Sequence, residues 1–462
     1  MAVTTLILML FSPSIALAAS AQPEDLHRLA REVLAELVAI RTVAGTGNSL
    51  RAAEALATRL TGAGFPTDDV RVVGPADSPG NLVVRWRGNR SAGRPLLLLA
   101  HLDVVDALRE DWSMDPFTLT EQDGFLYGRG TTDNKAGVAK LVAIFIRLRQ
   151  EGFVPDRELI MVITGDEETT QNGIRWLMEP PQDLANAELA LNTDAGFGDL
   201  DNGRRVRLSL QASEKVYLSF QLAVTNKGGH SSRPTEDNAI YRLAEGLTRI
   251  AEFRFPVVLN DVTRAFFQKS AEQASDAGVE DMKAILHVPL DPAAVARLTT
   301  SPYYNAMLRT TCVATMVSAG HAENALPQTA RAVVNCRILP GESVDEVERT
   351  LRRVVADEQI VITRIGEATP SPPSPLSKRV VDTIERLAAK HFPGVPVVPV
   401  METGATAGMY VRKAGVATYG IGAIFEDPND VRAHGRDERI ALDAFNDAVD
   451  YWYDMIKAFS FE

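Results

Sequence analysis

The sequence has little cysteine, no excess of positive charge and no apolar run long enough to cross a bilayer. Its 462 residues include 48 Lys and Arg against 60 Asp and Glu, and the resulting formal net charge of −12 argues against a nucleic acid partner. Only two cysteines occur, Cys312 and Cys336, and neither is a credible nucleophile or zinc ligand. With 45% hydrophobic and 23% charged residues, the composition is that of an ordinary soluble globular protein.

The longest apolar run, from Leu6 to Leu17, ends in the small-residue stretch Ala16-Leu17-Ala18 and is followed by polar residues. A run of about a dozen residues is too short for a transmembrane helix and is typical of a secretory signal peptide. We therefore predict a cleaved signal peptide over residues 1–18, a periplasmic or secreted protein, and no stable membrane insertion after processing. No Lys or Arg precedes the run, so the alternative is a disordered or membrane-tethered start.

Each cysteine lies in a stretch typical of a β-strand, 310–316 and 333–338, and the two stretches are predicted to be neighbouring antiparallel strands. A disulfide would suit an oxidising compartment, but two buried free thiols are the commoner outcome and are expected here. The sequence leaves both outcomes open.

Among the features that are present, the segment 162–168, Val-Ile-Thr-Gly-Asp-Glu-Glu, is the most informative. It reads as an apolar strand that ends in three consecutive carboxylates. Like charges at adjacent positions repel one another and resist burial, so this strand end indicates a cation that neutralises them, and we expect a divalent metal.

Further candidate ligands follow other apolar segments. They are His101 and Asp103, Asp133, Asp194, and a late His434. Four strands that end in or near such residues fit an open α/β sheet whose chemistry lies beyond the carboxyl ends of its strands. Alone, each residue could be an ordinary polar contact, a helix cap or part of a solvated loop. Together they supply two imidazoles and at least three carboxylates, enough for two zinc ions that share a bridging carboxylate.

These residues resemble a known family. The order His101-x-Asp103, Gly-Arg-Gly-Thr-Thr-Asp133-Asn-Lys, Asp166-Glu-Glu168, Asp194 and His434 is similar to the M20 family of co-catalytic zinc metallopeptidases and aminoacylases. The resemblance covers nearly the whole mature chain. The sequence of residues 101–105, 124–130 and 152–155 is similar to that of the carboxypeptidase S and N-acyl-amino-acid hydrolase branch of the family.

The resemblance implies a role for each residue. Asp133 would bridge two Zn²⁺ ions per subunit, with Co²⁺ or another divalent metal as an alternative. His101 and Asp194 would complete one metal site, and Glu168 and His434 the other. Glu167 would be the general base, because a base must reach the attacking water without being tied up as a ligand. Asp103 would accept the second imidazole N–H of His101, and a cis peptide bond is implied after Asp133.

A chain of this length predicts two domains. The pattern βαββαβ between Val216 and Thr363 predicts an inserted ferredoxin-like α+β domain, with an extra helical segment at about 255–304. We therefore expect an α/β catalytic domain with a mixed sheet, formed by residues 19–213 and 369–462, and an inserted lid and dimerisation domain over residues 214–368. The Pro-rich stretch 369–375 would return the chain to the catalytic domain.

Several lid residues match functional positions of the family. His230 is implied to reach the site of a neighbouring subunit in a homodimer and to stabilise an oxyanion. Asn324 and Arg337 match substrate-binding positions, and the planar fork of Arg337 suits a free carboxylate. In the catalytic domain Gly404 and Thr406 keep part of a substrate-binding loop, but the usual Asp and Arg of that loop are missing near Ala407 and Met409, which could change substrate preference.

The function predicted is a di-zinc hydrolase that cleaves the amide bond next to a C-terminal amino acid, in a small peptide or an N-acyl amino acid. An aminoacylase or dipeptidase is the nearest alternative. Hydrolysis of a non-peptide amide, such as a carbamate or amidine, also stays open, because one fold serves many chemistries. A non-catalytic zinc-binding protein is a further alternative, against which the free base Glu167 argues.

Overall fold

The computed structural model describes residues 23–46, 48–78, 80–89, 93–180, 182, 184–273 and 278–461. The predicted signal peptide, residues 1–18, lies outside these described residues. Within them, every helix is too short or too polar to serve as a bilayer span.

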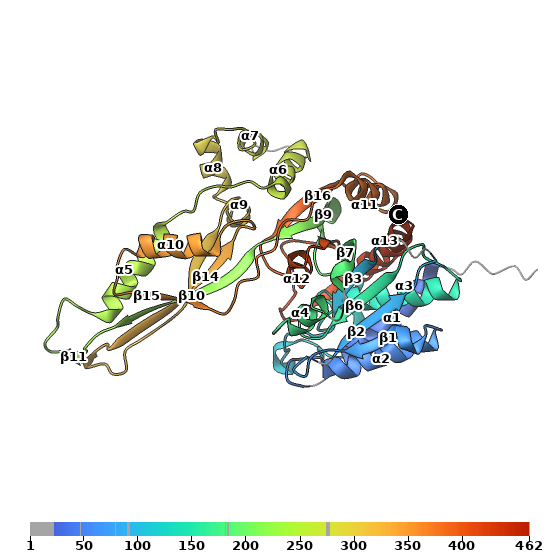
Figure 1. The fold of residues 1–462 in the computed structure, drawn as a ribbon, viewed down its shortest axis with the longest axis horizontal. Coiled ribbons are helices and arrows are strands. Elements are labelled where there is room, and N and C mark those ends of the chain that lie inside the picture. The colour runs from blue at the N-terminus through green and yellow to red at the C-terminus, as the bar shows by residue number, and fades with distance from the viewer. Residues whose placement is uncertain are drawn as a thin grey trace, which may run out of the picture.

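The larger part of the molecule, which we call the body, is built on one mixed sheet (Figure 1). Nine of its strands have the order β1-β2-β6-β3-β7-β17-β9-β8-β18, and β16 pairs with β9. Strands β6, β3, β7 and β17 run parallel to one another. The strands are β1 (Val70–Val73), β2 (Asn81–Trp86), β3 (Leu96–His101), β6 (Leu159–Thr164), β7 (Leu189–Asn192), β8 (Gly198–Asp201), β9 (Arg204–Glu214), β16 (Val397–Glu402), β17 (Ala417–Gly420) and β18 (Phe425–Glu426). This mixed α/β sheet confirms the predicted fold class.

Helices cover both faces of the sheet, which explains why its central strands are continuous apolar runs. Along β3, Leu96 and Leu98 face one apolar cluster, whereas Leu97 and Leu99 face another. The first cluster receives α1 (Pro23–Ala39), α2 (Asn48–Gly62), α3 (Lys135–Gln150), α11 (Lys378–His391) and α13 (Leu442–Ser460); the second receives α4 (Asn172–Met178) and α12 (Gly408–Lys413). A small sheet of β4 (Thr120–Gln122), β5 (Phe125–Tyr127) and β19 (Arg439–Ala441) and three 3₁₀ turns at Thr67–Asp69, Arg109–Asp111 and Leu184–Asn186 complete the body.

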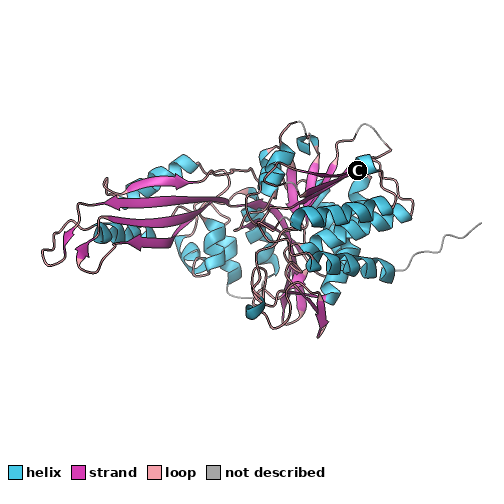
Figure 2. Cartoon of the chain, turned by 90° about the horizontal axis from the view of Figure 1, so that it is seen from below, coloured by secondary structure: helices cyan, strands magenta, loops and turns pink. Residues whose placement is uncertain are grey.

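A second, four-stranded antiparallel sheet extends away from the body, and we call it, with its two helices, the lid layer (Figure 2). Its order is β12-β14-β10-β15, which is the ferredoxin-like arrangement predicted from the βαββαβ pattern. The elements are β10 (Val216–Thr225), α5 (Ala239–Glu252), β12 (Thr311–Ala319), β14 (Thr329–Ile338), α10 (Val344–Val355) and β15 (Val361–Ile365). Two short strands, β11 (Gly229–His230) and β13 (Ala325–Leu326), pair at its tip.

Local sequence explains how the two lid helices start and how they pack. The Asn238 side chain accepts hydrogen bonds from two backbone amides at the start of α5. Ser343 and Glu346 form the sequence pattern of a capping box at the start of α10, and the Ser343 side chain accepts from the amide of Glu346. Both helices pack on one face of the sheet and form an apolar core with β10 and β14. The other face carries no helix from the lid layer.

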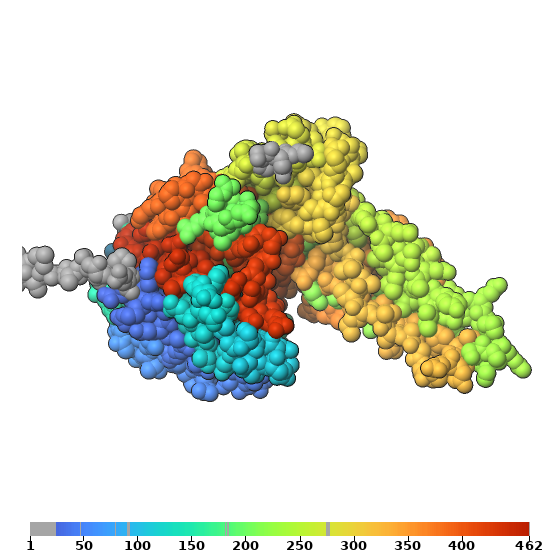
Figure 3. All heavy atoms as spheres, turned by 180° about the vertical axis from the view of Figure 1, so that it is seen from behind, coloured from blue at the N-terminus to red at the C-terminus, as the bar shows by residue number. Residues whose placement is uncertain are grey.

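The extra segment is helical, as predicted, but it packs on the body. Its helices are α6 (Asp261–Gln273), α7 (Gly278–Ala284), α8 (Pro292–Leu298) and α9 (Pro302–Leu308). Phe266, Phe267 and Met307 belong to the large apolar cluster of the body, and Lys269 Nζ donates to the backbone oxygen of Val397 in β16 at 3.3 Å. In Figure 3 these helices (yellow) lie over the junction between the body and the lid layer.

The expectation of two free thiols is wrong, because Cys312 and Cys336 form a disulfide. The predicted antiparallel strands are β12 and β14, and their register places the two cysteines directly opposite each other. Opposed residues of an antiparallel pair bring their side chains together, so the pairing follows from the register. Sequence alone placed both residues on strands but could not supply that register.

Candidate metal centre

The predicted ligands gather because three of their strands are neighbours. His101 is the last residue of β3, Asp194 follows β7, and Glu167 and Glu168 follow β6. Since β6, β3 and β7 are parallel, their carboxyl ends meet at one edge of the sheet. Asp133 reaches the same edge from the turn before α3, where the implied cis peptide bond between Asp133 and Asn134 is present.

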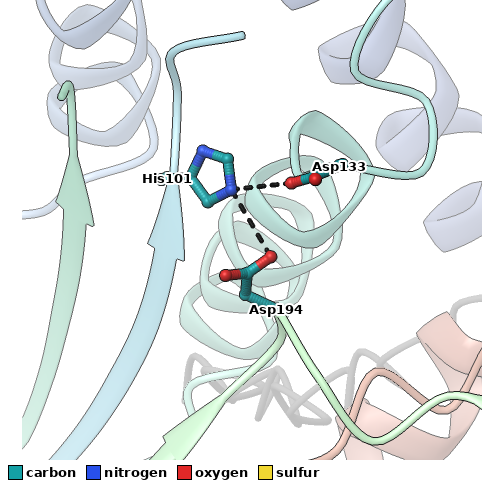
Figure 4. A group of neighbouring side chains, drawn as sticks. All are labelled: His101, Asp133 and Asp194. Atoms are coloured by element: carbon teal, nitrogen blue, oxygen red, sulfur yellow. Dashed lines mark hydrogen bonds and ion pairs between the residues drawn. The ribbon is translucent and has the colours of Figure 1, made fainter. Parts of the chain in front are cut away.

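His101, Asp133 and Asp194 point toward one another (Figure 4). The Nε2 atom of His101 lies 2.9 Å from Asp133 Oδ1 and 3.4 Å from Asp194 Oδ1, and the side chain is only 1% exposed. Its Nδ1 atom lies 3.1 Å from the backbone oxygen of Asp103. A proton on Nδ1 would be held by that oxygen, which leaves Nε2 free as a metal ligand.

Asp103 holds the segment that carries Glu167 and Glu168 in place. Its carboxylate accepts hydrogen bonds from the backbone N–H groups of Glu167 (2.9 Å) and Glu168 (2.8 Å). The contact predicted for this carboxylate, with Nδ1 of His101, is longer at 3.5 Å, because both oxygens are engaged by these amides. Asp103 therefore ties the end of β3 to the loop that follows β6.

A second group forms around His434. Its Nε2 atom lies 2.9 Å from Glu168 Oε1 and 3.0 Å from Asp133 Oδ2. Asp133 thus faces His101 with one oxygen and His434 with the other. This shared carboxylate is the arrangement that two adjacent metal ions with one bridging ligand require.

Two buried residues that the sequence reasoning missed support this geometry. The Glu438 carboxylate accepts from the backbone N–H groups of Gly130, Thr132 and Asp133, at 3.0, 2.8 and 3.1 Å. It also pairs with Arg129 at 2.7 Å, and Arg129 in turn donates to the backbone oxygen of Gly435 at 2.9 Å. The two segments that carry Asp133 and His434 are thereby joined. Two sequence features could have pointed to these residues: Arg129 lies in the motif Gly-Arg-Gly-Thr-Thr, and Glu438 is an acid four residues after His434.

The electrostatics of the acidic group favour a bound cation. Burial, together with the charges of Asp194, Glu168 and Asp133, raises the pKa of the Glu167 carboxyl well above its usual range, against the opposing charge of His101. Burial likewise raises the pKa of Asp194 to about 6. Burial also opposes ionisation of Asp133, but hydrogen bonds from His101 and His434 outweigh it and hold the Asp133 pKa well below its ordinary value. Divalent cations would relieve the mutual repulsion of these carboxylates.

Within the described residues, three overlapping sets could hold a metal ion: His101 with Asp133 and Asp194, Asp133 with Glu168 and His434, and His101 with Glu167 and Glu168. The first two sets share Asp133 and contain the five predicted ligands. Imidazole nitrogens and carboxylate oxygens are donors that zinc accepts, so the residues present fit a pair of zinc ions.

Glu167 has a partner that the sequence reasoning did not single out. The side-chain amide of Gln171 donates to Glu167 Oε1 at 2.8 Å. The backbone of Gln171 has a φ of +51°, in the left-handed region, and this turn returns its side chain toward the preceding acids. The contact orients the carboxyl group predicted to act as the base.

A cavity of about 540 Å³ lies between the candidate metal ligands and the lid layer. Arg337 and Tyr217 line it from the lid sheet, where they are opposed in register on the face without helices, and the Arg337 guanidinium lies 4.7 Å from the Tyr217 ring centre. Burial lowers the pKa of Arg337. From the body the cavity is lined by Glu167, Glu168, Thr169, Thr170, Gln171, Gly404, Ala405, Met409 and Tyr410, and the chain after β15 adds Glu367 and Thr369. Arg337 therefore faces the same space as the predicted base.

The loop with the missing Asp and Arg is held by another ion pair. Thr406 is buried, and its backbone N–H donates to the Glu214 carboxylate at 2.6 Å. Glu214 also pairs with Arg412, and both side chains are almost fully buried. Gly404 lines the cavity, whereas the Thr406 hydroxyl lies within 3.1 Å of the Gly408 amide and 3.4 Å of the Asn192 amide. The contacts of Glu214 with Thr406 and Arg412 thus hold this loop, although it lacks the Asp and Arg expected near Ala407 and Met409.

His230 and Asn324 do not join the metal group of their own chain. Both are exposed at the tip of the lid layer, where His230 lies in β11 and the backbone oxygen of Asn324 accepts from the Ser231 amide at 3.0 Å. Figure 1 shows β11 at the end of the lid layer that is remote from the body. The predicted site residues therefore lie in separate places: the metal group, the cavity wall with Arg337 and Gly404, and the tip of the lid layer with His230 and Asn324.

A family profile and individual known proteins match this chain over most of its length. The sequence profile of peptidase family M20/M25/M40 matches residues 97–458. A human N-fatty-acyl-amino acid synthase/hydrolase, PM20D1, is 29% identical over 381 residues, which are 80% of this chain and 75% of the relative. A probable carboxypeptidase S-like protein 2 of Dictyostelium discoideum is 27% identical over 389 residues, 82% of this chain and 74% of the relative.

Solved structures show the same fold. An M20 family metallo-carboxypeptidase from Sulfolobus solfataricus superposes with a TM-score of 0.71 at 19% identity, over 93% of this chain and 99% of that one. The di-peptidase Dug1p from Saccharomyces cerevisiae gives a TM-score of 0.66 at 14% identity, over 95% of this chain and 97% of that one. At these identities the likeness concerns the fold alone.

Proposed function

This chain belongs to peptidase family M20/M25/M40, and on that basis we propose that it is a di-zinc hydrolase that cleaves the amide bond next to a C-terminal amino acid. The family makes it a metal-dependent hydrolase of the peptidase or acylase kind. The substrate class, the two zinc ions and the residue roles are the proposal. One observation carries it: two histidine–carboxylate groups share Asp133, and Glu167 lies beside them.

His101, Asp133 and Asp194 would hold one zinc ion, and Asp133, Glu168 and His434 the other. When bound, the two ions would polarise the scissile carbonyl and make the attacking water more acidic. Glu167 would accept the proton of that water and pass it to the leaving amine. Gln171 would keep the Glu167 carboxyl oriented for both transfers, and Asp103 would fix the backbone that carries it.

Arg337 would bind the free carboxylate of the substrate, because it lines the cavity opposite Glu167 and its planar fork suits a carboxylate. Tyr217 stacks on the guanidinium and would hold it in position. Gly404 would shape the other wall of the cavity, and the buried Thr406 would hold the loop that carries it. In this arrangement the free carboxylate would lie toward the lid layer and the scissile bond toward the metal group.

We further propose a homodimer through the lid layer, in which His230 and Asn324 complete the site of the other subunit. Two features support it: both residues lie at the remote tip, and β12 is an edge strand with Val313, Met316 and Val317 60%, 68% and 71% exposed. An apolar edge strand is a ready surface for pairing with a second copy. His230 would then stabilise the oxyanion of the tetrahedral intermediate in the partner's site.

Export of the protein is also part of the proposal. The apolar run at residues 6–17 is typical of a signal peptide, and the Cys312–Cys336 disulfide is of a kind that persists in oxidising compartments. Both features favour a periplasmic or secreted location.

Hydrolysis of N-acyl amino acids is a second candidate for the same site. The side chains of Tyr217, Met409 and Tyr410 line the cavity, and Met409 stands near the position where the family commonly has Arg. Apolar and aromatic walls of this kind suit an acyl chain. The sequence similarity to a human N-fatty-acyl-amino acid synthase/hydrolase also supports this candidate function.

The test is a mixed panel of dipeptides, longer peptides and N-acyl amino acids, with the released amino acid quantified for zinc-loaded wild type and Glu167→Ala. We expect release by the wild type and none by the variant, at equal zinc content. The preferred substrates distinguish the peptidase from the acylase. A wild type that binds zinc and releases nothing would refute both.

A further inference from the structure

A second cavity, of about 300 Å³, lies at the junction of the lid layer with the α8 and α9 helices, away from the residues that form the metal group. Arg254, Asn305 and Arg309 line it. They share one property, which is that each side chain carries N–H donors, and among the described residues no carboxylate lines this space. None of the described residues that line this cavity therefore supplies a negative charge to its two guanidinium groups.

Arg309 is the decisive residue. Its side chain is 8% exposed, and its Nε atom is buried without a hydrogen-bond partner among the described residues. Burying a guanidinium without a carboxylate is unfavourable, because the lost hydration is not replaced. Burial and the neighbouring charge of Arg254 both lower the Arg309 pKa, so the second arginine increases the need for an anion.

The other donors complete a site for an anion. One nitrogen of the Arg254 guanidinium donates to the backbone oxygens of Ala251 (2.6 Å) and Phe253 (3.1 Å), which fixes the group, while its other nitrogens donate to no residue that the structure describes. The two guanidinium groups carry only N–H donors, and the Asn305 amide adds two more N–H donors and a single acceptor oxygen. Such a set of donors suits an oxyanion. We propose that this cavity binds a small oxyanion, a carboxylate or a phosphate group.

The location gives such a ligand a structural consequence. Lys215, between β9 and β10, donates from Nζ to the backbone oxygen of Arg309 at 2.7 Å and lies 3.4 Å from the Thr311 hydroxyl. Two chain connections between body and lid layer are thus joined beside the cavity. An anion held by Arg309 stabilises this junction and raises the unfolding temperature of the whole chain.

The test is calorimetric titration of the zinc-loaded full chain with inorganic phosphate and, separately, with acetate at matched ionic strength. We expect saturable binding of at least one of them, weakened by at least about tenfold in Arg309→Gln and in Arg254→Gln. Arg204→Gln, which removes an exposed guanidinium outside the cavity, should bind like the wild type. The anion that binds shows whether the site accepts a phosphate group or a carboxylate.

Anions can also bind at zinc, so the comparison between variants is essential. Binding at the metal centre would persist unchanged in Arg309→Gln, and equal binding by wild type and this variant overturns the proposal. The absence of binding for both anions overturns it too, as does an equal loss in Arg204→Gln. Without anion, Arg309→Gln should unfold at the same or a higher temperature than the wild type, since it removes an uncompensated buried charge.

Discussion

At the scale of single residues, the three consecutive acids after β6 have three different environments. Asp166 accepts from the Gly173 amide (3.1 Å) and the Thr170 hydroxyl (2.6 Å) and so forms the turn before α4. Glu167 accepts from Gln171, and Glu168 faces His434. The sequence pattern predicted an acidic cluster with a cation, but only the direction of each side chain separates a turn residue from a candidate base and a candidate ligand.

Gln171 gives a prediction at this scale. Replacing Gln171 with Ala removes the hydrogen bond that orients Glu167, so kcat should fall by about tenfold while KM and zinc content stay near the wild-type values. Steady-state kinetics with metal analysis measure all three. Gln122→Ala, at an exposed position in β4, is the matched control. A rise in KM with unchanged kcat would show that Gln171 binds substrate and does not position the base.

The grouping of the candidate ligands could be predicted from sequence because strand ends are visible as apolar runs that stop at polar residues. The residues that support them could not, since their role depends on contacts between distant segments. Glu438 lies 305 positions after Asp133 and accepts from its amide, and Tyr217 meets Arg337 only through the register of β10 and β14. Neither contact has a signature in a single sequence.

At the scale of elements, α3 is the most deeply buried helix adjoining the site, and it carries a lysine into the core. Lys140 is 1% exposed, donates to the backbone oxygen of Gly422 at 2.7 Å and lies 5.0 Å from the Trp452 ring centre. Burial lowers its pKa from 10.5 to about 7. The amphipathic pattern of the sequence does not predict a buried lysine, because its burial depends on a hydrogen-bond acceptor from another element.

This lysine predicts a pH dependence of stability. Between pH values of about 7 and 10.5 the unfolded chain holds a proton on Lys140 that the folded chain lacks, so this group makes the folded state gain stability as pH rises. Lys140→Met removes that contribution. The difference in unfolding free energy, wild type minus variant, should therefore increase with pH over this range, as measured by denaturant titration at equal zinc loading. Lys413→Met, at an exposed position, controls for net charge, and a difference that falls with pH would contradict the assignment.

At the scale of the whole molecule, an inserted ferredoxin-like layer was predictable because the order of strands and helices changes in the middle of the chain. The position of α6 to α9 was not, because their apolar faces fit either part equally well at the level of pattern. Their side chains complete the core of the body. The division at residues 213/214 and 368/369 stays a prediction.

The proposed dimer makes a prediction that only the assembly can fulfil. If His230 acts in the site of the partner, His230→Ala and Glu167→Ala are each inactive, but a mixed dimer contains one site with both residues. Mixing and re-equilibrating equal amounts should restore about a quarter of wild-type activity, since about half of the dimers are mixed and each has one complete site. Activity assays with light scattering measure this, and mixtures as inactive as their components would contradict the exchange of His230.

The shared ligand Asp133 offers the most direct test of the account as a whole. Zinc should be counted per chain by elemental analysis and by competitive titration for the wild type, Asp133→Ala and Asp77→Ala, which replaces an exposed acid outside the metal group. We predict two zinc ions per chain for the wild type and for Asp77→Ala, and loss of high-affinity binding at both sites together with loss of hydrolysis for Asp133→Ala. A wild type that binds a single ion, or an Asp133→Ala variant that keeps two, would contradict the shared di-metal centre.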